Sequence, residues 1–176
     1  MTKEKLEILL VEDELVLVSA AEEILTQNGY DVRWIRPQDA LQGEVWEGTA
    51  KPNVLAVIDL YYTGSEAAHI RSSELKSAVA LDGSGEDIIY MFDEERKDNP
   101  SYGANKVIIA TSLDHIVEPK TIAPFIARVE TYDIYGYKKG KGPDGSVNSS
   151  NYARGLLETI RQVERGELKP LNLRKI

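Results

Sequence analysis

Five short apolar runs alternate with helical patterns along the whole chain. Three of these runs are almost continuously apolar, which is typical of strands that are covered on both faces. The predicted strands comprise residues 7–11, 31–35, 54–59, 106–112 and 133–137. Because strand and helix alternate, the sequence predicts an α/β fold in which a parallel sheet has helices on both of its faces.

The segments between these strands place apolar residues at helical spacing. The first predicted helix stops at Gly29, and the second begins near Pro37, where proline suits a first turn. The predicted helices comprise residues 14–28, a short segment from 37, 85–97, 120–131 and 150–165. The last of them is expected to bury Ala153, Leu156, Leu157, Ile160 and Val163.

Residues 61–80 do not fit the alternation, and we interpret them as an insertion after the third strand. The chain has 176 residues, a length that suits one domain with an extension. We therefore expect a single domain over residues 1–165, with the insertion at about 61–80. Residues 166–176 form a tail that is too short to be a second domain.

Composition excludes several classes of function. The net charge is −8 and the sequence pI is about 4.9, so a nucleic-acid partner bound through a basic surface is not expected. The chain has no cysteine, which excludes disulfides and thiolate metal sites. No segment has the length of a membrane span. We expect a cytoplasmic protein with no nucleic-acid or membrane partner.

Polar side chains follow four of the predicted strands, where each strand ends. Their positions are Glu12 and Asp13, Asp59, Thr111 with Ser112, and Lys138 with Lys139. In a parallel sheet these ends meet at one edge, where ligands bind. Three carboxylates at one edge need a cation or shifted pKa values. Mg²⁺ is favoured because it prefers oxygen ligands, whereas a zinc site would call for cysteine or histidine.

The stretches EILLVEDE, VLAVIDL, KVIIATS and DIYGYKK, in this order, resemble the receiver domain of two-component response regulators over about residues 5–165. The resemblance implies a flavodoxin-like, doubly wound sheet of five parallel strands. It implies that Asp59 accepts a phosphoryl group, and that Thr111 and a lysine assist. It also implies a Mg²⁺ site made by Glu12, Asp13, Asp59 and the backbone carbonyl of Tyr61. Glu14 is interpreted as a partner of the helix dipole rather than a ligand.

The family lysine corresponds to Lys138 or Lys139. Lys138 is preferred because the family often carries an aromatic switch residue three positions earlier, which is then Tyr135. The alternative, Lys139, would put Gly136 at the switch position. The proline that usually follows the family lysine is missing in both alignments.

The function that the resemblance implies is a phosphorelay switch rather than an enzyme. A histidine kinase or phosphotransfer protein would donate the phosphoryl group, and output would pass through contacts with an unknown downstream protein. The sequence is compatible with a homodimer as well as with a monomer. One alternative is a receiver-like interaction module that is not phosphorylated. Another is a Mg²⁺-dependent aspartyl-phosphate hydrolase, although such phosphatases commonly have a second aspartate where this chain has Tyr61.

Overall fold

The computed structural model describes residues 5–41, 54–59, 85–98, 106–111, 129–140 and 147–171. The predicted insertion at about 61–80 lies outside these residues, as does most of the helix predicted over 120–131. The elements in chain order are β1 (Glu7–Val11), α1 (Leu15–Gln27), β2 (Asp31–Ile35), α2 (Pro37–Leu41), β3 (Val54–Asp59), α4 (Gly85–Asp98), β4 (Lys106–Thr111), β5 (Asp133–Lys138) and α6 (Ser149–Glu164). All five predicted strands are present, and the predictions for β4 and β5 miss the observed end by one residue each.

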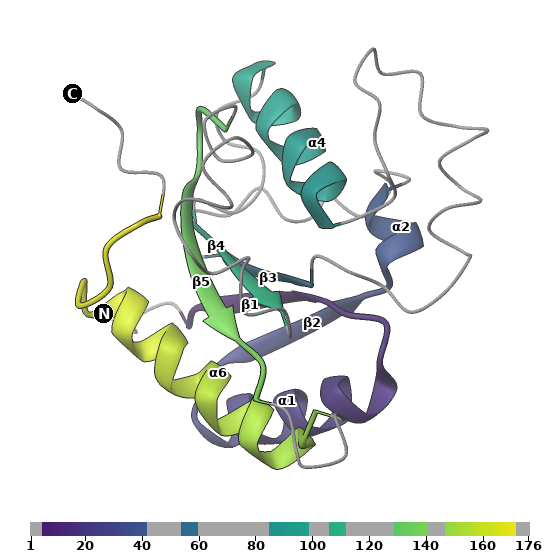
Figure 1. Ribbon diagram of the computed structural model, residues 1–176, viewed down its shortest axis with the longest axis vertical. Coiled ribbons are helices and arrows are strands. Elements are labelled where there is room, and N and C mark those ends of the chain that lie inside the picture. The colour runs from purple at the N-terminus through teal and green to yellow at the C-terminus, as the bar shows by residue number, and fades with distance from the viewer. Residues whose placement is uncertain are drawn as a thin grey trace.

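The five strands form one sheet in the order β2-β1-β3-β4-β5, and every neighbouring pair is parallel (Figure 1). This is the flavodoxin-like strand order, in which the direction of winding reverses between β1 and β3. The predicted doubly wound α/β fold is therefore confirmed. The carboxyl ends of β1 and β3 lie side by side at the reversal, which is where such folds place their ligands.

Helices cover both faces of the sheet. Figure 1 shows α1 and α6 packed beneath it and α4 with α2 above it. In-register residues point to the same face: Leu10, Val57, Ile108 and Tyr135 belong to the core under α1 and α6. Their neighbours one position later, Val11, Ile58 and Ile109, belong to the core under α4.

Two helix ends are built by glycine. Gly29 after α1 has φ 88° and Gly166 after α6 has φ 69°. Residues that have a Cβ rarely adopt such positive φ angles. After α6, the amide of Glu167 donates to the carbonyl of Gln162 and that of Gly166 to the carbonyl of Val163. This pattern of bonds satisfies the last carbonyls of the helix. The predicted stop at Gly29 is confirmed.

The described part of the tail lies along the edge of the sheet. The amide of Leu171 donates to the carbonyl of Ile134 in β5 at 2.7 Å. Leu168 packs against the core under α6, and Leu171 packs against the core under α4. The tail therefore crosses from one face of the sheet to the other past the edge strand β5. None of the helices that the structure describes is long and apolar enough to cross a membrane.

Candidate functional site

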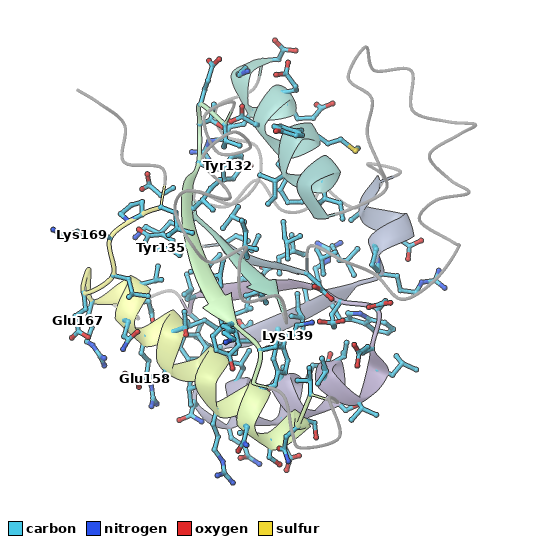
Figure 2. The ribbon with its side chains drawn as sticks, in the orientation of Figure 1. Tyr132, Tyr135, Lys139, Glu158, Glu167 and Lys169 are labelled. Carbon is cyan, nitrogen blue, oxygen red and sulfur yellow. The ribbon has the colours of Figure 1, made fainter. Side chains whose placement is uncertain are left out.

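Three charged side chains from separate strands meet in the interior at the carboxyl edge of the sheet. The ammonium of Lys139 lies 2.7 Å from Oε2 of Glu12 and 3.0 Å from Oδ2 of Asp59. Glu12 follows β1, Asp59 ends β3 and Lys139 follows β5 (Figure 2 labels Lys139). The three residues are exposed by only 1%, 5% and 2%, in that order. We call Glu12, Asp59 and Lys139 the charged cluster.

The pleat of the sheet explains why these three residues meet. Side chains alternate between the two faces of a strand, so every second residue points the same way. Leu10 and Val57 both face α1 and α6. Glu12 is two residues after Leu10, and Asp59 is two residues after Val57, so both acids point to the same face. Tyr135 and Tyr137 in β5 pack on that same core, and the next position in the series is Lys139. The charged cluster continues this row of residues past the strand ends.

The same alternation corrects the choice between the two lysines. Lys138 is exposed and has the opposite parity, whereas Lys139 is buried against both carboxylates. Lys139, the alternative, is therefore the lysine that the structure places with Glu12 and Asp59, and Lys138 lies outside this group. With Lys139 as the family lysine, Gly136 is three positions before it, so the spacing that suggested Tyr135 as a switch residue does not apply in that alignment. Tyr135 is 6% exposed and packs in the core under α1 and α6.

Glu12 is fixed by backbone groups as well as by Lys139. Its Oε1 accepts hydrogen bonds from the amides of Asp13 at 3.0 Å and Glu14 at 3.1 Å. Its backbone carbonyl accepts a bond from the indole of Trp34 in β2 at 2.9 Å. These contacts hold the turn between β1 and α1 in one conformation, with its carboxylates close to the strand ends.

Burial and crowding shift the pKa values of the charged cluster. Burial, and then the charge of Asp59, raise the pKa of Glu12 to about 8, although Lys139 opposes this. Burial alone would lower the pKa of Lys139, but Asp59 and Glu12 outweigh it, so that the pKa is raised. The ammonium therefore stays charged between two carboxylates. One positive charge faces two acids, and the cluster favours additional positive charge or a proton.

The three acids that follow β1 have the chemistry of a Mg²⁺ site. Glu12, Asp13 and Glu14 each offer an oxygen, and these atoms lie within 4.8 Å of one another. Three such oxygens suit a hard divalent cation. Glu14 was not expected in such a group, and Asp59 is not part of this group of three. Of the other predicted site residues, Tyr61 and the side chain of Thr111 lie outside the described residues.

Two aromatic residues at the cluster were not expected from the sequence. The ammonium of Lys139 lies 5.5 Å from the centre of the Tyr152 ring, which belongs to the first turns of α6. The Tyr137 ring lies against that of Tyr152, with 6.0 Å between the centres. The hydroxyl of Tyr137 donates to the backbone carbonyl of Tyr152 at 2.9 Å. Tyr152 is thus fixed beside the lysine.

Comparison with known proteins identifies the architecture. No family model matches the sequence, and no curated protein sequence matches it significantly. Among solved structures, the signal receiver domain of an HD domain-containing protein from Pseudomonas fluorescens Pf-5 matches with a TM-score of 0.50. The two are 14% identical, and the match covers 93% of this chain and 98% of that one. The chain has the receiver fold.

Other solved structures with the receiver fold are similar to the chain. A CheY-like receiver domain protein from Methanospirillum hungatei JF-1 is 20% identical, with a TM-score of 0.49 and coverage of 93% of this chain and 97% of that one. The response regulator TrrA from Thermotoga maritima, in complex with Mg(2+)-BeF, is 18% identical, with a TM-score of 0.49 and coverage of 89% and 97%. At these identities the likeness concerns the fold alone. In this receiver fold, the charged cluster lies at the carboxyl ends of β1, β3 and β5.

Proposed function

We propose that the chain is a cytoplasmic response-regulator receiver that accepts a phosphoryl group on Asp59 from a histidine kinase or phosphotransfer protein. Signalling would follow through protein contacts rather than through turnover of a substrate. The observation that supports this most directly is the position of Asp59. It ends β3 beside the reversal point of the sheet, 3.0 Å from the ammonium of Lys139 and next to the acids that follow β1.

The proposed reaction is a transfer between two nucleophiles. A carboxylate oxygen of Asp59 attacks phosphorus, and a new P–O bond forms as an acyl phosphate. With a phosphohistidine donor the P–N bond breaks, and the imidazole that leaves takes up a proton. With acetyl phosphate a P–O bond breaks and acetate leaves. The ammonium of Lys139 lies where it can balance the negative charge of the transferred group.

Mg²⁺ fits this proposal because the available donors are carboxylate oxygens. Glu12, Asp13 and Asp59 would hold the ion, with the backbone carbonyl of Tyr61 as the fourth protein ligand. When bound, Mg²⁺ neutralises negative charge on phosphoryl oxygens. Phosphorylation turns the singly charged carboxylate of Asp59 into an acyl phosphate with up to two negative charges, a net gain of about one. This change alters the ion pairs of Lys139 and hence the packing of the segment after β5. The proposal names no particular downstream partner and is compatible with either a monomer or a homodimer.

The proposal is tested by weighing the intact protein after incubation with acetyl phosphate and Mg²⁺. We expect the gain of one phosphoryl group, its loss when Mg²⁺ is chelated, and its absence from the Asp59→Asn variant. Asp13→Asn provides a comparison in which the acceptor is intact and a metal ligand is weakened. A protein that gains no mass would instead be an interaction module that is not phosphorylated. Sustained release of phosphate from a small phosphate ester would indicate a hydrolase.

A further inference from the structure

Tyr152 has a buried hydroxyl without a hydrogen-bond partner among the described residues. The residue is 0% exposed, so water does not replace the missing partner at the surface. Buried hydroxyls nearly always have a partner, because leaving one unpaired costs free energy. The hydroxyl of Tyr152 is therefore available to a ligand that binds beside it.

The position of Tyr152 is fixed from two sides. The Tyr137 hydroxyl donates to its backbone carbonyl, and the two rings pack against each other. Gly155 permits the close approach of β5 and α6, because a Cβ there would collide with the hydroxyl of Tyr137. The first turns of α6 are thus held against the end of β5, and Tyr152 cannot turn away without breaking these contacts.

The surroundings of Tyr152 favour an oxygen acceptor as the partner of its hydroxyl. Burial, and then the charges of Glu12 and Asp59, raise the pKa of Tyr152 well above its usual value, so its hydroxyl keeps its proton and acts as a donor. The ammonium of Lys139, over the same ring, already donates to both carboxylates. An anionic group that arrives at Asp59 would find Tyr152 as the donor that the cluster has not yet engaged.

We propose that the Tyr152 hydroxyl donates a hydrogen bond to an oxygen of the phosphoryl group on Asp59, while its ring holds the Lys139 ammonium at the carboxylates. This inference rests on the proposed receiver function and adds a binding residue from α6 to it. A phosphoryl group on Asp59 would then contact α6 directly, through Tyr152 in the first turn of that helix.

The test uses Tyr152→Phe, which keeps the ring and removes only the hydroxyl. Without the unpaired group, the thermal midpoint of the ligand-free protein should rise by about 2–4 °C. The affinity for beryllofluoride at saturating Mg²⁺, measured by calorimetric titration, should fall about five- to tenfold, as expected for the loss of one hydrogen bond. Beryllofluoride is the probe because it mimics a phosphoryl group attached to a carboxylate. A hydroxyl with only a structural role would not move the two quantities in opposite directions.

Tyr30→Phe is the matched control. Its hydroxyl donates to Glu164 at the opposite end of the sheet, so its removal should lower the thermal midpoint and leave the beryllofluoride affinity unchanged. An unchanged affinity in Tyr152→Phe, with binding by the unaltered chain intact, would overturn the role of Tyr152 and leave the receiver function standing. No binding by the unaltered chain would overturn both.

Discussion

At the scale of single residues, the charged cluster is unbalanced in a way that favours ligand binding. Lys139 is shared by Glu12 and Asp59, so one buried ammonium faces two buried carboxylates. Removing charged groups from water is costly, and an interior ion pair repays this only when every charge is matched. The unmatched carboxylate is tolerable because Glu12 can hold a proton, as its raised pKa indicates. A divalent cation would supply the missing positive charge instead.

Replacement of Lys139 should destabilise the protein strongly. Lys139→Met keeps the length of the side chain but leaves two carboxylates with no cation between them. We expect the free energy of unfolding at pH 8 to fall by about 3 kcal/mol, the cost of breaking a buried ion pair. Added Mg²⁺ should restore part of the loss. The measurement is urea denaturation with and without Mg²⁺.

Lys138→Met is the control for this substitution, because Lys138 is adjacent but exposed. Its effect should stay within about 0.5 kcal/mol, as is usual for surface positions. Equal effects of the two substitutions would contradict the assignment of Lys139 to the site.

Stability should depend on pH through Glu12. Its pKa is about 8 in the folded protein against an ordinary value of 4.5, so between these values the folded state binds more protons than the unfolded state. The stabilisation is therefore complete below about pH 4.5 and is lost as the pH rises towards 8. Urea denaturation of the metal-free protein from pH 5 to 8.5 should show this decline, on the order of a few kcal/mol. Glu12→Gln should flatten it, and a profile that is the same in both proteins would refute this origin.

At the scale of elements, one buried aspartate fastens α4 to the segment that leads into β5. Asp93 is 1% exposed and accepts bonds from the amides of Glu130 and Thr131 and from the Thr131 hydroxyl. Lys97, one turn later in α4, lies 3.4 Å from the same carboxylate. These bonds tie α4 to the residues directly before β5.

Asp93→Ala should therefore lower the free energy of unfolding by about 2–4 kcal/mol, because buried backbone donors are left unpaired. Glu94→Ala is the matched control at the next position. Its side chain is exposed and forms an ion pair with Lys97 at the surface, so a change within about 0.5 kcal/mol is expected. Chemical denaturation of both variants checks the difference, and a mild Asp93→Ala effect would mean that water satisfies the 130–131 amides.

The element pattern was predictable because local signals coincide. Apolar runs end at acids in β1 and β3, and glycine ends α1 where the helical spacing stops. The site was less predictable. The alternation of side chains along β5, from Tyr135 through Tyr137, leads to Lys139. The family's spacing of three residues between switch residue and lysine favoured Lys138 instead. Tyr152 is four residues before Leu156 on the buried face, but nothing in the sequence indicates that Lys139 lies over its ring.

At the scale of the whole molecule, the described tail joins the two cores around the edge of the sheet. β5 is an edge strand, and an exposed edge offers unpaired backbone groups to other chains. The tail uses one of these groups, the carbonyl of Ile134, and places Leu168 and Leu171 on opposite faces. We therefore expect the tail to stabilise the domain and to limit pairing between copies at β5.

Ending the chain at Glu167 should lower the free energy of unfolding by about 2–3 kcal/mol, since two partly buried leucines and a backbone hydrogen bond are lost. It should also increase self-association, because the β5 edge is uncovered. The double variant Leu168→Ala, Leu171→Ala keeps the backbone bond and should lose stability without a comparable rise in self-association. Urea denaturation and light scattering over a concentration series separate the two effects. If both proteins stay equally monomeric, the tail contributes packing alone and does not protect the edge.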